Sequence, residues 1–450
     1  MSADYHARSH YLSGGTLLWV TRNGVTDQAD TLLHYLKTVD DIGFSQSRFF
    51  VVKIEEDLRK IKNLEFDKDD DISEIAARLD YNLTKAYLRY LIGQRYGFVN
   101  PRRLFNSLDK DVNDSTGRTF RQLYDVKTKT VRNKDVDSLL SLIKYNGVSE
   151  TLRNSETQHP LYKKLKSLLP HVSGEERMKV LVNMERCRWR TGSNPFDYKK
   201  YVFVNLPSYG LLAVDGDDVL SMKVVSGSHK TKTPLLDSRI TRMDINPKWI
   251  IPTSIVKREI SLHAGDYDYF ERNNYVIKDR TTGIVVSPEN LSQDDFKSGK
   301  YRVVQDGGEG NALGRIIFRF NNNFSIFLHD TSSRSAFNRT NRSVSHGCIR
   351  VEKAYELACF LLSDKNTKIL EKLKYSMQIR TRVPDDAEKD AKEYHIDKSK
   401  LLHSLSVNPQ VPIFISYFTK WLMPDGQLVT YNDVYGYDEV IARQIREYIR

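Results

Sequence analysis

The sequence predicts an α+β protein with a mostly helical N-terminal domain, followed by a β-rich domain that carries an inserted segment. Apolar residues recur with the 3.6-residue period of a helix up to about residue 195, and short alternating strand patterns follow. Residues 252–300 are polar and interrupted by Gly and Pro, which is typical of an inserted lobe or a long loop. We therefore expect domains at 1–195 and 196–383, and a C-terminal extension at 384–450 that packs a β-hairpin on them.

Length and composition are those of a globular protein. A chain of 450 residues, with 40% hydrophobic and 28% charged residues, is long enough for two or three domains. Lys and Arg exceed Asp and Glu by 69 − 58 = 11. This balance suits either an acidic partner or an ordinary solvated surface. Because the basic residues are scattered along the chain and do not form a contiguous basic block, we expect no nucleic-acid partner.

Cysteine usage and hydropathy exclude several classes. The three cysteines, Cys187, Cys348 and Cys359, form neither a disulfide framework nor a zinc-type pairing, and no cofactor or metal is expected. We expect Cys187 and Cys359 to be helical core residues. No run approaches 18 apolar residues, so no transmembrane helix is predicted. The N-terminus lacks the charged-then-apolar pattern of a signal peptide, which alone would indicate the cytoplasm.

The helices of the N-terminal domain follow from apolar spacing. The stretch 26–37 carries Ala29, Leu32, Leu33 and Leu36 on one face, and the stretch 71–96 repeats apolar residues at four-residue steps. The remaining predicted helices cover 135–145, 160–169 and 173–189.

Strands dominate beyond residue 195. We expect strands at 201–205, 211–214 and 219–225, with an Asp215-Gly216 turn between the last two. A second hairpin joins 316–320 to 324–328 through three Asn residues, and His329 ends its second arm. A helix that carries Ala354, Leu357, Ala358 and Leu361 on one face is expected after Cys348, with its N-terminus two or three residues beyond the thiol. A late hairpin is expected from 411–418 and 428–431.

The most informative segment is Ser345-His346-Gly347-Cys348-Ile349-Arg350. It places a thiol in a tight Gly turn, with His329 19 residues upstream. A Cys is nucleophilic as thiolate, so it needs a base or a positive environment, which the helix N-terminus would supply. The segment therefore predicts an acyl-transfer enzyme.

The residues leave some roles open. His329 is the preferred base and His346 is the alternative, since it lies two residues from Cys348. The amides of Gly347 and Cys348 are the expected oxyanion donors. Arg350 is either a ligand for a substrate carboxylate, or a surface cation or member of an internal salt bridge. Asp330 either orients an imidazole or closes a strand-end turn.

These motifs resemble those of the YkuD-type L,D-transpeptidases, and the likeness covers nearly the whole chain. Beyond the Cys348 motif, matches to the larger YcbB-like subgroup are Asn183-Met-Glu-Arg186 with Trp189, Asn246-Pro-Lys-Trp-Ile-Ile-Pro252, Asn311-Ala-Leu-Gly314, Leu328-His-Asp-Thr331, Phe337-Asn338, Arg350-Val-Glu352, Ile415-Ser-Tyr-Phe-Thr419, Asp425-Gly426 and Asp433-Val-Tyr435.

The resemblance implies a peptidoglycan L,D-transpeptidase with a helical scaffold domain and a β-rich, sandwich-like catalytic domain, into which a mobile capping subdomain is inserted at 252–300. Its thiolate would attack the L-diamino acid carbonyl of a donor tetrapeptide, release D-Ala and pass the acyl group to an acceptor amine, forming a 3-3 cross-link. The implied catalytic residues are Cys348, His329, His346 and Gly347, and the implied substrate-binding residues are Arg350, Ser345, Asp330, Thr331 and Asn338.

The resemblance also implies partners and a location. The expected ligands are peptidoglycan stem peptides and, covalently, carbapenems, with other cell-wall enzymes as further partners. The location would be the periplasm or cell envelope, and we expect the chain to be truncated after an export signal. The predicted helices at 160–169 and 173–189 adjoin, which leaves no room for the peptidoglycan-binding module of many relatives. Glycan anchoring would then fall to the basic surface or to a partner.

Three other functions use the same residues. An L,D-carboxypeptidase or a lipoprotein-attaching transpeptidase would share the thioester, and a non-catalytic wall-binding protein would carry Cys348 as a relic. A papain-like protease is disfavoured, because its His follows the Cys, whereas His329 precedes Cys348.

Overall fold

The computed structural model describes residues 2–68, 70–111, 119–308, 310–363, 366–378 and 397–449. The chain divides into two compact units, one made of Met1–Ser193 with Tyr417–Arg450 and the other of Asn194–Ser416. The domain boundaries predicted at 195 and 383 stay predictions, and the start of the predicted C-terminal extension, 384–396, lies outside the described residues.

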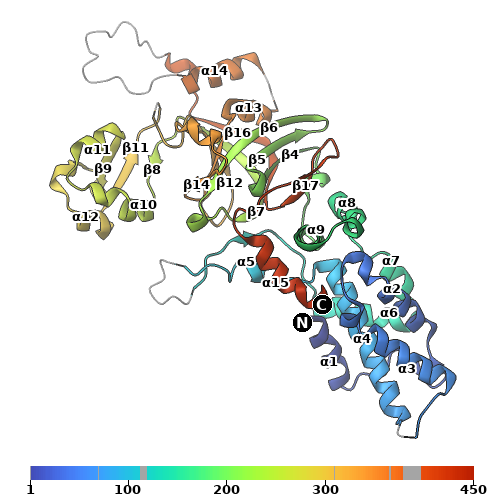
Figure 1. Cartoon of the computed structure of the whole chain (residues 1–450). Coiled ribbons are helices and arrows are strands. Elements are labelled where there is room, and N and C mark those ends of the chain that lie inside the picture. The colour runs from blue at the N-terminus through green and yellow to red at the C-terminus, as the bar shows by residue number, and fades with distance from the viewer. Residues whose placement is uncertain are drawn as a thin grey trace, which may run out of the picture. The chain divides into compact units, whose positions relative to one another are not determined.

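The first unit is mainly helical (Figure 1). All the helices predicted for the N-terminal region are present, with ends shifted by at most two residues. Its helices are α1 (Ser2–Leu12), α2 (Asp27–Lys37), α3 (Val51–Asn63), α4 (Ile72–Tyr96), α5 (Pro101–Phe105), α6 (Asn133–Lys144), α7 (Val148–Arg153), α8 (Pro160–Leu168), α9 (Gly174–Arg188) and α15 (Tyr437–Ile449). Its short strands are β1 (Val20–Thr21), β2 (Gly24–Val25), β3 (Tyr124–Asp125), β17 (Lys420–Leu422) and β18 (Leu428–Thr430).

Helix α4 is the long central element of this unit. The carboxylate of Asp71 caps it by accepting hydrogen bonds from the backbone N–H groups of Ser73 and Glu74, which satisfies donors that the first turn leaves free. Farther along, the buried carboxylate of Asp80 accepts the backbone N–H groups of Leu18, Trp19 and Val20. Buried side chains of the surrounding helices form one hydrophobic core with the apolar face of α4.

The second unit is built on a sheet whose strands run in the order β12-β13-β15-β6-β5-β4-β16-β7. Strand β7 also pairs with β12, so this path closes on itself. The strands are β4 (Lys200–Asn205), β5 (Gly210–Asp215), β6 (Asp218–Gly227), β7 (Leu235–Ile245), β12 (Ile316–Phe320), β13 (Leu328–His329), β14 (Ser343–Ser345), β15 (Ile349–Val351) and β16 (Ser404–Ser416). Helices α13 (Ala354–Leu361) and α14 (Thr367–Gln378) follow β15.

The hairpin that leads to His329 is shorter than predicted. Strand β13 covers Leu328–His329, and Ile317 of β12 lies opposite His329. Residues 324–327 are not a strand, because Ser325 adopts a left-handed φ of 55°. The Asn322 side chain instead accepts the backbone N–H groups of Phe324 and Ile326. His329 nevertheless ends a strand, as predicted.

The inserted segment forms a lobe with its own core. Its elements are β8 (Trp249–Ile250), α10 (Thr253–Arg258), α11 (Tyr267–Arg272), β9 (Tyr275–Asp279), β10 (Val285–Val286), α12 (Gln293–Ser298) and β11 (Tyr301–Gln305). The strands pair in the order β10-β9-β11-β8, and the three helices lie beside them (Figure 1). Buried residues such as Phe270, Phe296 and Val303 pack between them, separately from the main sheet.

The late hairpin differs from the prediction. Its arms are β17 and β18, with Trp421 opposite Val429. The apolar run that begins at Val411 belongs instead to β16, which pairs with both β4 and β7 in the main sheet. A strand that is buried on both faces has apolar residues in continuous sequence rather than at alternate positions. This pattern does not show with which strand it pairs.

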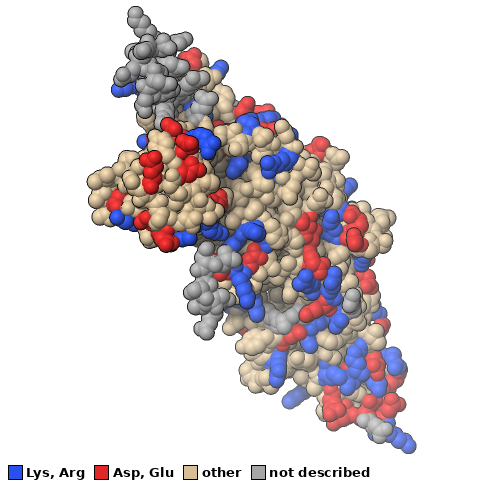
Figure 2. All heavy atoms as spheres, turned by 60° about the vertical axis from the view of Figure 1, so that its left-hand side comes forward, with Lys and Arg blue, Asp and Glu red and all other residues tan. Residues whose placement is uncertain are grey.

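Charge is distributed rather than concentrated on the face that Figure 2 shows, where Lys and Arg lie interspersed with Asp and Glu. Among the residues that the structure describes, no helix has the length and apolar character needed to span a membrane.

Candidate active site

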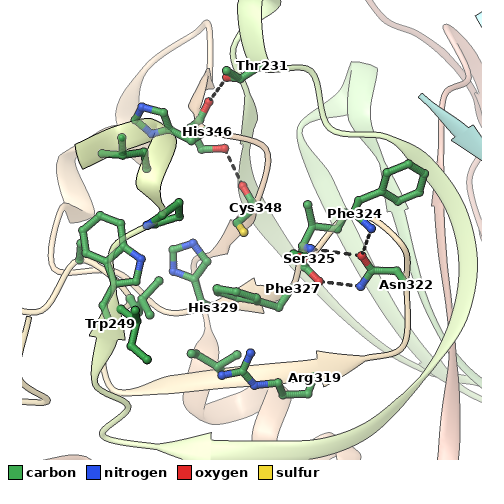
Figure 3. Close-up of a pocket in the computed structure, with 18 of the residues that line it drawn as sticks. Thr231, Trp249, Arg319, Asn322, Phe324, Ser325, Phe327, His329, His346 and Cys348 are labelled. Carbon is green, nitrogen blue, oxygen red and sulfur yellow. Dashed lines mark hydrogen bonds between the residues drawn. The ribbon is translucent and has the colours of Figure 1, made fainter. Parts of the chain in front are cut away.

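A cavity of about 900 Å³ in the second unit contains the predicted nucleophile. The main sheet contributes Cys348, His329 and Arg350 to its lining, and the inserted lobe contributes residues from Trp249 to Arg258. In Figure 3 the sulfur of Cys348 and the ring of His329 face the same space. The thiol and the imidazole, which are 19 residues apart in the sequence, therefore line the same cavity, as the motif predicts.

Cys348 lies in a turn between β14 and β15. Gly347 has a φ of 118°, a backbone conformation that residues other than Gly rarely adopt. The hydroxyl of Ser345 closes this turn, because it donates to the carbonyl oxygen of Cys348 at 2.6 Å and accepts the N–H of Gly347 at 3.2 Å. The Gly347 amide is therefore already engaged, which leaves the Cys348 amide as the better candidate for an oxyanion donor.

Two threonines donate hydrogen bonds to the backbone of this turn. Thr231 Oγ1 donates to the carbonyl oxygen of Ser345 at 2.8 Å, and Thr233 Oγ1 donates to that of Gly347 at 2.8 Å. The backbone on both sides of His346 is thereby fixed to the segment that follows β6. Reasoning from the sequence missed both threonines, since nothing in their spacing links them to a motif more than 100 residues away.

The surroundings of the thiol do not favour its anion. Burial raises the pKa of Cys348 to about 11, while the Phe327 backbone N–H and the charges of Arg319 and Arg350 lower it less. The prediction that a helix N-terminus lies two or three residues beyond the thiol is wrong. Residues 349–351 form strand β15, and α13 begins at Ala354, so its dipole starts six residues away. The resting thiol is protonated and needs a base.

His329 is placed to be that base. It is buried, and burial together with the charge of Arg350 lowers its pKa to about 3, so its ring is neutral near pH 7. Nδ1 lies 2.5 Å from the backbone carbonyl oxygen of Asp330. Because a carbonyl oxygen accepts and cannot donate, this contact assigns the proton of the neutral ring to Nδ1 and the lone pair to Nε2, and the backbone of Leu313 is a second hydrogen-bonding partner of the ring.

His346 is turned toward the inserted lobe. Its Nε2 lies 2.7 Å from Oε1 of Glu259, which follows helix α10. In Figure 3 the ring points away from the sulfur of Cys348. This orientation favours His329 over His346 as the base. Glu259 was missed from the sequence, because an exposed Glu 87 residues upstream of a motif carries no visible signal.

Cations line the cavity. They come from both the lobe and the sheet: Lys248, Arg258, Arg319 and Arg350. Among the described residues, no Asp or Glu lines the same space. The Nε atom of Arg350 is buried without a hydrogen-bond partner, and burial lowers the pKa of this guanidinium. The residue is half-buried, and a guanidinium that is partly removed from water without a partner for its Nε is costly, so this side chain is suited to an anionic ligand.

Three predicted substrate-binding residues lie outside the cavity lining. The Asp330 carboxylate accepts the backbone N–H of Arg315 at 2.9 Å, and Thr331 Oγ1 accepts that of Ser333. Asn338 is exposed at the end of a short 3-10 helix. Their substrate-binding roles stay predictions that the geometry does not support. Within the described part of the chain, no cluster of three or more His, Cys, Asp or Glu is arranged to hold a metal ion.

Comparison with known proteins identifies both halves of the chain. Residues 199–370 match the YkuD family model, an L,D-transpeptidase catalytic domain, and residues 7–169 match the model of a Scaffold domain. A Haemophilus influenzae protein named "Putative L,D-transpeptidase" is 29% identical over 317 residues, which are 69% of this chain. The chain covers 59% of that relative's length.

The two matched domains occur in the order that the sequence motifs predicted, and the Cys348 cavity lies in the part that matches the catalytic model. The chain thus carries a catalytic domain of the YkuD-type L,D-transpeptidase family, preceded by a Scaffold domain, which is the arrangement of the YcbB-like subgroup of that family.

Proposed function

We propose that this chain is a peptidoglycan L,D-transpeptidase that uses Cys348 as its nucleophile and forms 3-3 cross-links. The observation that carries the proposal is that the Cys348 thiol and the neutral His329 ring, with Nε2 unprotonated, line one cavity. A nucleophile and a base that share a cavity are the minimum for acyl transfer through a covalent intermediate.

Acylation would begin when His329 Nε2 takes the thiol proton. With a thiol pKa near 11, about 1 in 10⁴ molecules carries a thiolate at pH 7, so transfer accompanies the attack rather than preceding it. Sγ then bonds to the carbonyl carbon of the donor's L-diamino acid, and the backbone N–H of Cys348 stabilises the oxyanion. The C–N bond breaks, and the leaving D-Ala amine takes the proton from His329.

Transfer would reverse these proton movements. The side-chain amine of an acceptor stem attacks the thioester carbonyl, and His329 accepts a proton from that amine. The C–S bond breaks, the sulfur regains a proton, and an amide bond joins two stems. Because His329 is neutral over the physiological range, it is available as the base in both steps.

The charge of the cavity supports a peptide donor with free carboxylates. Stem peptides carry carboxylates at the terminal D-Ala and along the stem, and bidentate Arg contacts recognise such groups. Arg350, with its unpartnered Nε, is the cation that we assign to this task. The substrate places the site of action at the cell wall, in the periplasm or envelope.

Product analysis tests the reaction. The full chain is incubated with disaccharide-tetrapeptides, and the products are separated and weighed. Dimers that have lost one D-Ala support transpeptidation, whereas tripeptide monomers alone would indicate an L,D-carboxypeptidase. The Cys348→Ala variant is the matched control, and dimers formed by this variant would overturn the proposal, as would unchanged tetrapeptide with the unsubstituted chain.

A further inference from the structure

The pair of His346 and Glu259 joins two parts of the second unit that have separate hydrophobic cores. Oε1 of Glu259 accepts from Nε2 of His346 at 2.7 Å, and a carboxylate can only accept, so Nε2 carries the proton. Glu259 belongs to the inserted lobe, whereas His346 precedes the nucleophile by two residues. The contact therefore runs from the lobe to the catalytic turn.

The lobe end of this contact is firmly seated. The backbone N–H of Glu259 donates to the carbonyl oxygen of Ile255 at 2.9 Å. Ile255, Val256 and Ile260 on either side are buried in the core of the lobe. A shift of the Glu259 backbone would therefore have to move the lobe with it.

Further contacts lie at the two segments where the chain crosses between the lobe and the sheet. Asn311 Nδ2 donates to the carbonyl oxygens of Pro247 and Asp306, and Lys248 forms an ion pair with Asp306 at 2.8 Å. These contacts bind the crossing segments to each other. Glu259 is thus a separate point of attachment, away from the crossings in sequence.

We propose that Glu259 is a positioning residue for the transpeptidase reaction, an inference that rests on the function proposed above. Through His346 it holds the lobe where Trp249, Ile250 and Arg258 form a wall of the cavity that contains the thiol. This wall contacts a bound ligand and not the reacting atoms. The pair therefore acts on ligand binding and leaves the attack of the thiol unchanged.

The expected effect is modest and measurable. The side chains of His346 and Glu259 are 47% and 53% exposed. A hydrogen bond between two exposed side chains, one of them a carboxylate, shifts an equilibrium by a few-fold. We expect the half-saturating ligand concentration to rise about 2- to 5-fold when the pair is broken.

A carbapenem is the probe, used with the full chain. Sγ of Cys348 attacks the lactam carbonyl, the ring C–N bond breaks, and the ring nitrogen takes a proton, so the protein gains the whole mass of the compound. Mass spectrometry against time and concentration gives the half-saturating concentration and the maximal acylation rate. Glu259→Gln is expected to raise the first and to leave the second within about twofold.

Two comparisons separate positioning from a general disturbance. Glu271→Gln replaces an exposed Glu on α11 of the same lobe and is expected to behave as the unsubstituted chain. His346→Gln combined with Glu259→Gln is expected to cost no more than either change alone, since each change removes the same charge-assisted hydrogen bond between the carboxylate and the imidazole. Additive effects, an effect confined to the maximal rate, or no effect would overturn the proposal.

Hydrogen exchange tests whether Glu259 holds the lobe in place, and this measurement does not depend on enzymatic activity. Glu259→Gln is expected to speed amide exchange in residues 249–260, with Glu271→Gln unchanged. If the unsubstituted chain gains no carbapenem mass, the proposed function fails, and the exchange result still decides whether Glu259 holds the lobe. Unchanged exchange would show that it does not.

Discussion

The imidazole of His329 is oriented by the main chain of Asp330 and not by its carboxylate. Nδ1 lies 2.5 Å from the Asp330 carbonyl oxygen, whereas Oδ2 of the same residue accepts the backbone N–H of Arg315 at 2.9 Å. In triads that use a carboxylate, loss of that group upsets the imidazole tautomer. Here the tautomer is set by a group that substitution of the side chain does not remove.

This geometry predicts unequal effects at two adjacent residues. His329→Gln removes the base and should lower the acylation rate by about 10²- to 10⁴-fold. Asp330→Asn keeps the carbonyl and should lower it by less than about 10-fold. Single-turnover acylation by a carbapenem, followed by mass spectrometry, measures both. Equal losses in the two variants would show that the carboxylate does orient the imidazole.

The raised thiol pKa predicts how Cys348 reacts in the empty cavity. Since burial lifts this pKa to about 11, the thiolate appears only as pH rises toward that value. Alkylation of Cys348 by iodoacetamide should accelerate about tenfold for each pH unit from about 7 to 10. Peptide mass spectrometry resolves Cys348 from Cys187 and Cys359. A rate that levels off below about pH 8 would instead reveal a preformed thiolate–imidazolium pair.

Gly347 should be intolerant of a side chain for conformational reasons. A Cβ there would meet Ile326 and Thr231 no closer than 3.8 Å, so space is available, but φ is 118°. Gly347→Ala should therefore lower the free energy of unfolding by about 1–3 kcal/mol, measured by urea denaturation. Gly192→Ala, at a Gly outside the positive-φ region, is the matched control. Equal stability of Gly347→Ala and the unsubstituted chain would contradict the strained turn.

Arg350 should control binding of the donor stem. Arg350→Ala is expected to raise the KM for the tetrapeptide by about 10- to 100-fold, the usual worth of a hydrogen bond to a charged group. Arg350→Lys retains the charge but loses the planar fork, so it should restore binding in part. Arg443→Ala, at an exposed residue of α15, provides the control for loss of a cation. A loss confined to kcat would contradict a binding role.

Cys348 and His329 could be predicted from the sequence as a candidate pair because their signals are local. Cys348 is marked by the Gly347 turn, and His329 by its place at the end of a strand, and the structure puts both in one cavity. The helices α2 and α4 were equally visible from their apolar period. Motifs that resemble those of the family extended the prediction of a scaffold and a catalytic domain along the chain, and the two matched domain models support this prediction.

What could not be predicted depends on contacts across long sequence separations. Glu259 contacts His346 over 87 residues, and Thr233 supports Gly347 over 114. Backbone irregularities were missed too: Ser325 breaks an alternating pattern that reads as a strand, and β15 separates the thiol from α13. Alternation and spacing report local periods and do not show where tertiary contacts interrupt them.

The central claim is that Cys348 forms the acyl-enzyme, and intact-protein mass spectrometry tests it most directly. The full chain is mixed with disaccharide-tetrapeptide, quenched in acid and weighed, and the modified peptide is then mapped. We predict an adduct on Cys348 equal to the donor minus D-Ala, absent from Cys348→Ala, whose thermal unfolding should match that of the unsubstituted chain. An adduct on another residue, or cross-linked product formed by Cys348→Ala, would contradict the account.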